Sequence, residues 1–184
     1  MPWTEHERQL LRAVAFESIE FGLAHRCELP VSALDYSDRL RTATATFVTL
    51  RTHGELLGCV GTLRSCRPLV CDIAHNAYHA AFSDPRFAPL TAAQLVGLDL
   101  HISVLSPLER LAVRCEADLV ALIRPGVDGV VIEDGERTAT LLPAMWPRLA
   151  DPRVFVRALK EKAQLPADYW SAALTAFRYT VEDV

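Results

Sequence analysis

Apolar residues recur at helical spacing in several stretches of the chain. This pattern predicts long helices over residues 4–25, 69–82 and 154–165, and short helices near residues 91–97 and 116–123. Thr4 and Glu7 form a capping-box pattern at the start of the first helix, because a hydroxyl stands three residues before a carboxylate. Leu29-Pro30 stops helical continuation, so the segment through Arg41 is predicted to be a loop.

Runs rich in Val, Ile, Thr and Phe alternate with turn residues in other parts of the chain. They predict two β-hairpins, with strands at residues 45–50 and 56–63 and at residues 129–133 and 137–142. Asp134-Gly135 is a strong turn signal for the second hairpin. In residues 98–105 every second residue is apolar, which predicts a strand with one solvent-exposed face. A turn is predicted at residues 106–110 and a closing strand at residues 174–181.

Hairpin, proline-containing loop and helix occur twice, at residues 45–82 and 129–165. Two copies cannot form an array, so the repetition indicates an old duplication. Hairpins and helices interleave without the strand, helix, strand period of a parallel sheet, and this predicts an α+β fold. We expect one domain over residues 1–184, in which part of residues 85–128 forms a small subdomain.

Composition restricts the classes of partner. The 184 residues are 51% hydrophobic, which is typical of a folded globular domain. A net charge of −4, with Lys160 and Lys162 as the only lysines, disfavours nonspecific binding of nucleic acid. The sequence has neither a signal-peptide pattern nor a run of about 18 apolar residues, so we expect a soluble, cytoplasmic protein without a membrane partner. The five cysteines form no C-x-x-C pair, which argues against a disulfide framework and a zinc ribbon.

A cysteine stands between two glycines in the second predicted strand, in Gly58-Cys59-Val60-Gly61. The glycines indicate either a close approach of a ligand or another backbone, or a β-bulge. The cysteine is either a small buried hydrophobe or a functional thiol, which needs a neighbouring cation or histidine to lower its pKa. His75, His79 and His101 are the candidate bases, and the sequence does not place them relative to Cys59.

Asp84-Pro85-Arg86-Phe87 is predicted to be a rigid turn. Its Arg86 side chain suits either a carboxylate or phosphate of a ligand, or an intramolecular ion pair. His75 and His79 stand four residues apart on a predicted helix, a spacing that lets two imidazoles bind one zinc ion. This metal site is the weaker alternative, because Asn76 replaces the glutamate of H-E-x-x-H. No nucleophile-elbow, dinucleotide or P-loop motif occurs, and we predict no cofactor.

Five short blocks together resemble a known family. They are residues 57–63 (L-G-C-V-G-T-L), 84–90 (D-P-R-F-A-P-L), 102–107 (I-S-V-L-S-P), 129–132 (G-V-V-I) and 141–143 (L-L-P). The order and content of these blocks are similar to the AMMECR-one domain family, whose prokaryotic members are called AmmeMemoRadiSam system protein A. The resemblance implies an α+β fold with two related hairpin-plus-helix repeats around a mixed, barrel-like β-sheet. It also implies association with a Memo-type protein and a radical S-adenosylmethionine (SAM) protein.

The chain departs from two family motifs. Leu57 stands where the family motif L-R-G-C-I-G has arginine, and Gln164 stands where K-A-G-L has glycine. An anion that the family arginine would bind must here be bound by Arg64, Arg67 or Arg86, if it is bound at all. The resemblance implies that an active or binding site lies in the region of Cys59.

Two functions of different class follow. The first is a binding or accessory protein with a cleft around residues 58–62 and 84–87 that holds a small-molecule ligand or a partner segment. Its expected contact residues are Gly58, Cys59, Gly61, Thr62, Asp84 and Arg86. The alternative is an enzyme, a transferase or hydrolase, with Cys59 as catalytic nucleophile and Arg86 as anion clamp. The sequence permits a monomer and does not predict the oligomeric state.

Overall fold

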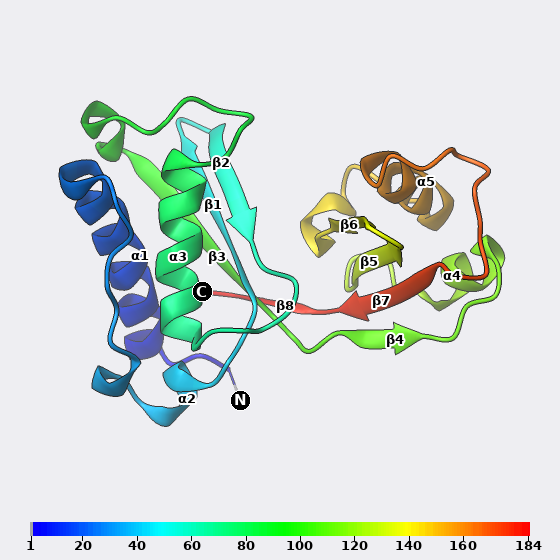
Figure 1. The fold of residues 1–184 in the computed structure, drawn as a ribbon, viewed down its shortest axis with the longest axis horizontal. Helices are drawn as coiled ribbons and strands as arrows, with labels where there is room; N and C mark the ends of the chain where they lie inside the picture. Colours follow the sequence, from blue (N-terminus) through cyan, green and yellow to red (C-terminus); the bar gives the residue numbers. More distant parts are fainter. Residues whose placement is uncertain (1) are drawn as a thin grey trace. The chain divides into compact units, whose positions relative to one another are not determined.

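The structure is a computed structural model that describes residues 2–184 and forms two compact units. The first unit contains the chain up to residue 107 together with residues 182–184, and the second contains residues 108–181. Figure 1 shows the elements of both units in sequence colours. The boundary falls inside residues 85–128, the segment in which a small subdomain was expected. No helix in the described part of the chain is long and apolar enough to cross a membrane.

The first unit is a four-stranded antiparallel sheet with two long helices against it. Its elements are α1 (Glu5–His25), η1 (Ala33–Asp35), α2 (Asp38–Arg41), β1 (Thr46–Thr52), β2 (Glu55–Gly61), α3 (Leu69–Phe82), η2 (Ala92–Leu95), β3 (Leu98–Leu105) and β8 (Val181–Asp183). The strand order is β2-β1-β3-β8, which leaves β2 at one edge. Helices α1 and α3 lie side by side, and α3 packs on β1 and β2 (Figure 1).

Helix α1 begins as its sequence predicts. The Thr4 hydroxyl accepts the Glu7 N–H at 3.2 Å, and the Glu7 carboxylate accepts the Thr4 N–H at 2.9 Å, which completes the capping box. The core of this unit joins one face of α1, one face of α3 and the alternate residues of β1 and β3, including Leu11, Ile19, Ile73, Val48 and Ile102. The apolar residues that recur at helical spacing in α1 and α3 and at every second position in β1 and β3 therefore pack together in one core.

The second unit is a smaller sheet covered by α5. Its elements are β4 (Glu109–Leu111), α4 (Glu116–Leu122), β5 (Gly129–Asp134), β6 (Arg137–Leu141), η3 (Pro143–Met145), α5 (Pro152–Lys162) and β7 (Thr175–Tyr179). The strand order is β4-β7-β5-β6. Phe155, Leu159 and Trp146 contribute to a core that is separate from that of the first unit, and the Trp146 and Phe155 rings stack at 4.0 Å.

The same arrangement occurs in both units. In each, a hairpin is followed by a helix and then by a third strand that pairs antiparallel with the first hairpin strand, giving the orders β2-β1-β3 and β6-β5-β7. The predicted pair of hairpin-plus-helix repeats is thus present, and the α+β class is confirmed. The expected single barrel-like sheet is instead two open antiparallel sheets.

Three local expectations differ from the structure. Residues 109 and 110, expected within the turn at residues 106–110, belong to strand β4, which pairs with β7. The expected closing strand at residues 174–181 is divided between β7 and β8, which belong to different sheets. The segment between α1 and β1, expected to be a loop, contains the short helices η1 and α2. Each of these short elements depends on contacts with distant residues, which local periodicity does not report.

Candidate functional site

Cys59 lies on β2, at the outer edge of the first sheet. Its backbone N–H and C=O are directed away from β1, and residues of the turn after α3 bind both groups. The Asp84 carboxylate accepts the Cys59 N–H at 2.9 Å, and the Arg86 Nη2 donates to the Cys59 carbonyl at 3.0 Å. The two side chains therefore satisfy the edge N–H and C=O that a further strand would otherwise pair.

Asp84 and Arg86 are joined as a fork. Arg86 donates from Nε to Asp84 Oδ1 at 2.9 Å and from Nη2 to Oδ2 at 2.7 Å. The hydrogen bond from the Arg86 side chain lowers the pKa of Asp84 to about 2. The backbone N–H groups of Cys59 and Arg86 also lower this pKa, whereas burial raises it. The Asp84 side chain is 3% exposed, whereas that of Arg86 is 56% exposed. The intramolecular ion pair is thus formed, and it holds a guanidinium at the surface.

The Cys59 thiol is half-buried and lies beside polar groups of two kinds. The Thr49 hydroxyl on β1 donates to its Sγ at 3.3 Å. The Arg86 guanidinium contacts the backbone carbonyl of the same cysteine, and its pKa is raised chiefly by the hydrogen bond to Asp84, against the effect of burial, with a smaller increase from Cys59.

None of the three candidate bases is a neighbour of this thiol. His101 on β3 is paired with Thr49, which is itself paired with Cys59, so two strand spacings of about 10 Å in total separate them. His101 instead contacts Asp183 at 2.9 Å. His75 and His79 lie on α3 and contact Glu28 at 2.8 and 2.9 Å. A general base must lie within hydrogen-bond reach, about 3 Å, of the proton that it removes.

The two glycines next to Cys59 are required by internal packing. A Cβ on Gly58 would stand 1.9 Å from the carbonyl oxygen of Ala80, and a Cβ on Gly61 would stand 2.2 Å from the ring of Phe47. The space next to the Cα atoms of both glycines, where the expected cleft would lie, is therefore filled by other atoms of the protein. A β-bulge is also present: Leu50 pairs with Gly58 and Arg51 with Leu56, which leaves Leu57 as the extra residue.

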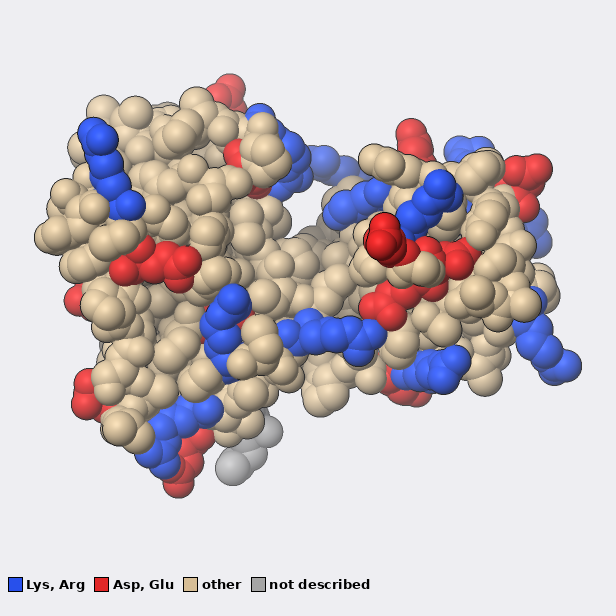
Figure 2. Space-filling view, viewed as in Figure 1, with Lys and Arg blue, Asp and Glu red and all other residues tan. Residues whose placement is uncertain are grey.

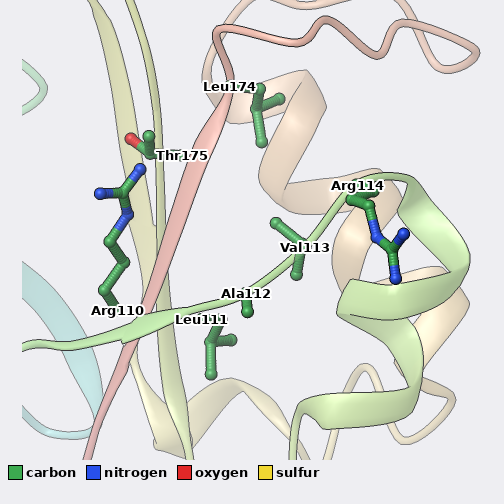
Figure 3. A pocket seen from close by; sticks show the side chains of 7 residues that line it. All are labelled: Arg110, Leu111, Ala112, Val113, Arg114, Leu174 and Thr175. Carbon is green, nitrogen blue, oxygen red and sulfur yellow. The ribbon is translucent and has the colours of Figure 1, made fainter.

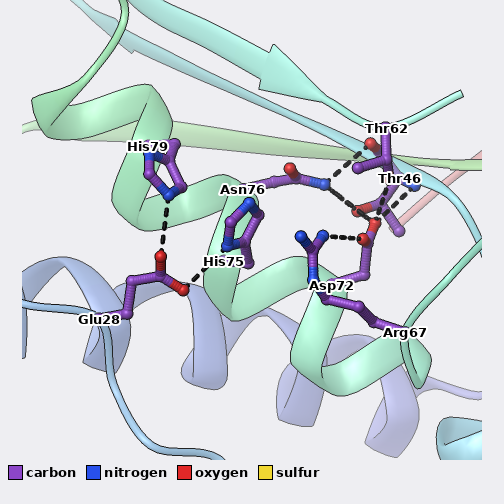
Figure 4. Close-up of polar contacts among 8 residues, drawn as sticks. All are labelled: Glu28, Thr46, Thr62, Arg67, Asp72, His75, Asn76 and His79. Atoms are coloured by element: carbon purple, nitrogen blue, oxygen red, sulfur yellow. Dashed lines mark hydrogen bonds and ion pairs between the residues drawn. The ribbon is translucent and has the colours of Figure 1, made fainter.

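Thr62 belongs to a buried network centred on Asp72, shown in Figure 4. Asp72 Oδ2 accepts the Thr46 N–H at 3.0 Å, the hydroxyls of Thr46 and Thr62 at 2.7 Å each, and Asn76 Nδ2 at 2.9 Å. Arg67 donates to Oδ1 at 3.2 Å. Asp72 and Asn76 are fully buried. The network ties α3 to β1 and to the end of β2, so the position of Thr62 is fixed by fold-stabilising bonds.

Sequence reasoning missed two features that the structure brings to view. Glu28 lies between α1 and η1 and meets both His75 and His79, which are 47 and 51 residues away, so no local motif could have indicated it. The second feature is a pocket of about 510 Å³ in the second unit, at the end of β4 (Figure 3). Arg110 and Arg114 flank its apolar wall, which includes Val113 and Leu174.

Surface charge agrees with the composition. On the face shown in Figure 2, Lys and Arg residues are interspersed with Asp and Glu, and no continuous basic surface is visible there. A nucleic-acid backbone is bound by many clustered cations, so this face does not have the character of such a site.

The chain is an α+β protein with two open antiparallel sheets and a polar cluster at Cys59, Asp84 and Arg86 on the edge of one of them. The model of the AMMECR1 family, the AMMECR-one domain of the sequence resemblance, matches residues 12–184. The chain therefore belongs to the AMMECR1 family.

Relatives and a solved structure agree with this assignment. A protein of Methanothermobacter thermautotrophicus is 35% identical over 183 residues, which cover 98% of this chain and 95% of that protein. A protein of Thermotoga maritima is 36% identical over 138 residues, or 74% of each chain. The crystal structure of the uncharacterized protein PH0010 from Pyrococcus horikoshii has a TM-score of 0.89 and 27% identity, and the match covers 98% of this chain and 91% of that one.

Proposed function

We propose that the protein is a binding or accessory protein whose first unit captures a ligand or a partner segment through Arg86, beside Cys59. The observation that carries this proposal is that the Arg86 side chain is both ordered by hydrogen bonds and exposed. Its guanidinium is fixed by a buried carboxylate and a backbone carbonyl, yet 56% of the side chain is exposed. An arginine that is already ordered binds a carboxylate or phosphate with a smaller loss of side-chain entropy.

The arrangement of donors indicates which group is bound. Arg86 uses Nε and Nη2 in its contacts with Asp84 and Cys59, and Nη1 makes no hydrogen bond with the residues that the structure describes. The Arg86 side chain is 56% exposed and contacts the residue that carries the half-buried thiol. An anionic oxygen from a small molecule, or a carboxylate side chain of a partner segment, suits this combination of cation and modestly polar surroundings.

The partner that we expect follows from the family. A Memo-type protein and a radical SAM protein are the two proteins with which the resemblance associates the prokaryotic members. We propose that one of them supplies the segment that contacts Arg86. Binding is favoured over catalysis because the three candidate bases, His75, His79 and His101, make their contacts with Glu28 and Asp183 and not with the Cys59 thiol.

The test measures the affinity of the purified protein for each of the two candidate partners by biolayer interferometry. We expect Arg86→Ala to weaken the complex at least tenfold and Arg86→Lys to weaken it less, because lysine keeps the charge but lacks the fork. Arg41→Ala is the matched control, since Arg41 also pairs with an aspartate, Asp38, on the surface. The proposal fails if neither partner binds, or if Arg86→Ala binds as tightly as the unchanged protein.

The alternative function is that of a transferase or hydrolase with Cys59 as nucleophile. The contacts of the thiol with the Thr49 hydroxyl and the nearby Arg86 guanidinium favour it. Alkylation by iodoacetamide, followed for each cysteine by mass spectrometry from pH 6 to 10, distinguishes the two functions. The exposed residues Cys27, Cys66 and Cys115 serve as references. The enzyme requires Cys59 to react as a thiolate below about pH 7.5, while the binding protein requires no such reactivity.

A further inference from the structure

Two histidines and a glutamate converge on the side of α3 that faces the segment between α1 and η1. Glu28 Oε2 lies 2.8 Å from His75 Nδ1, and Oε1 lies 2.9 Å from His79 Nε2. One ligand-type atom from each of the three residues lies within 4.8 Å of the other two. Figure 4 shows both imidazole rings directed at the same carboxylate. These contacts are independent of the Arg86 site.

The donor set is one that divalent transition metals bind. Imidazole nitrogen and carboxylate oxygen bind Zn²⁺ at about 2.0–2.2 Å, and two histidines with one glutamate form known three-residue zinc sets. Four-coordinate bonds of this length hold ligand atoms ~3.4 Å apart. Since the three atoms of Glu28, His75 and His79 already lie within 4.8 Å of one another, side-chain movements of about an ångström bring them to this spacing.

Charge and access also fit a cation. Glu28 supplies a carboxylate, the one acidic ligand of the set, beside the two imidazoles. The side chains of His75, His79 and Glu28 are 24%, 29% and 46% exposed, so an ion can reach them from solvent. The glutamate that the sequence motif lacked at position 76 is thus replaced by one from a different segment.

Asn76, which occupies that motif position, has another task. Its amide binds Asp72 and Thr46 in the buried network, on the side of α3 that faces the sheet. It therefore cannot act on a metal-bound water as the glutamate of H-E-x-x-H does. The cluster has the ligands of a metal site without the accompanying general base of that motif.

We propose that Glu28, His75 and His79 form a binding site for one divalent transition-metal ion of the zinc type. The ion replaces the direct contacts between the carboxylate and the imidazoles and joins the segment before η1 to α3. Three protein ligands leave at least one coordination position for water or for a donor atom of another molecule. Binding also stabilises the folded state, because the three ligands are together only when the chain is folded.

The test is equilibrium dialysis of the metal-free protein against Zn²⁺, with affinity measured by competition with a chromogenic chelator. We expect the unchanged protein to bind one more zinc ion than His75→Ala/His79→Ala, and Glu28→Gln to weaken that ion at least tenfold. His101→Ala is the matched control, because His101 with Asp183 is also a surface pair of imidazole and carboxylate. It should bind zinc like the unchanged protein. Zinc bound by exposed cysteines is common to all variants and cancels in these differences.

A second readout keeps the test decisive if the double variant folds poorly. X-ray absorption at the zinc edge should show two imidazoles and an oxygen ligand in the unchanged protein, and loss of the oxygen contribution from Glu28 in Glu28→Gln. The proposal is overturned if the double variant binds as many ions with the same affinity as the unchanged protein. It is equally overturned if the unchanged protein binds no zinc, or if the ion that the double variant loses is bound through sulfur.

Discussion

Each unit has a fully buried aspartate near its hairpin, and the two residues act over different distances. Asp72 in the first unit accepts hydrogen bonds from β1, from the residue after β2, from α3 and from Arg67. The Asp128 carboxylate in the second unit accepts its hydrogen bonds, within the described residues, from the backbone and side chain of Arg124, four residues earlier. The first carboxylate ties separate elements together, and the second closes one turn.

The packing of the main helix against its hairpin also differs between the two units. In the first unit α3 approaches β2 so closely that backbone meets backbone at Gly58 and Ala80. In the second unit α5 packs mainly through apolar side chains such as Phe155 and Leu159. A helix that is bound to its hairpin by polar groups holds other polar side chains in fixed positions. The Cys59 thiol, the Arg86 guanidinium and the pair of His75 and His79 all belong to this first unit.

The close packing of α3 is tested most severely by Gly58→Ala. Because the added Cβ would stand 1.9 Å from a backbone oxygen, the helix or the strand must shift, and we expect a loss of at least about 5 kcal/mol in unfolding free energy or failure to fold. Gly135→Ala in the second hairpin is the control. Its Cβ meets no atom within 4 Å, and the positive φ of 60° costs only about 1–2 kcal/mol. Urea unfolding measures both, and equal losses would contradict the packing argument.

The two buried aspartates give the next largest difference. We expect Asp72→Ala to lose about 3 kcal/mol, because it leaves the N–H and hydroxyl of Thr46 buried without their acceptor and removes one acceptor of the Asn76 amide. Asp128→Ala should lose about 1–2 kcal/mol, because the Arg124 side chain is 52% exposed and returns to water.

Amide hydrogen exchange with peptide resolution checks where each loss occurs. Asp72→Ala should increase exchange in β1, in α3 and at the end of β2, because the carboxylate binds all three. Asp128→Ala should increase exchange only around residues 124–128. If both variants loosen only their own turns, the contrast between long-range and local carboxylates is wrong.

The sequence predicts the elements that neighbouring residues encode, but it does not predict those that depend on contacts between residues far apart in the chain. The hairpin turn at Asp134-Gly135 and the capping box at Thr4 are encoded by adjacent residues, so both repeats and α1 could be located in advance. Strand β4 could not, because its three residues are held by pairing with β7, more than sixty residues later. The family resemblance supplied the order of the blocks but not the separation of the two sheets.

The candidate sites show the same limit. Cys59, Asp84 and Arg86 could each be selected from residue type and motif, but their contact depends on the turn after α3 returning to the free edge of β2. The role of Gly58 could be reduced only to close approach or a bulge, and it involves both. Glu28 stands in a segment without periodicity, so its meeting with the histidines follows from tertiary structure alone.

The edge contact of Asp84 predicts a pH effect of intermediate size. Its folded pKa of about 2 lies below the ordinary 3.8, so its contribution to stability is fully present above about pH 4 and disappears as pH falls through 2. The difference corresponds to about 2 kcal/mol at neutral pH. We expect Asp84→Asn to lose this amount at pH 7, and the gap to the unchanged protein to close between pH 4 and 2. Urea unfolding at several pH values checks this, and a gap that persists at pH 2 contradicts the carboxylate's assigned role.

The smallest effect concerns how the helices of the two units end. Arg26 after α1 and Gln164 after α5 both take the left-handed conformation, with φ of 58° and 57°, that favours glycine. Backbone bonds from Gln164 to Glu161 and from Leu165 to Lys160 form the usual glycine-type helix end without the glycine. Both residues are exposed, so Gln164→Gly and Arg26→Gly should each stabilise by about 1 kcal/mol.

Thermal or urea unfolding of the two variants measures this gain, and Gln164→Ala is the control because alanine removes the side chain without relieving the strain. If Gln164→Gly increases the unfolding free energy and Gln164→Ala does not, the absence of the family's glycine destabilises the protein only through the left-handed backbone conformation. If neither variant is more stable, the left-handed residue is held by contacts of its own side chain, and the helix end of the second unit depends on more than its backbone hydrogen bonds.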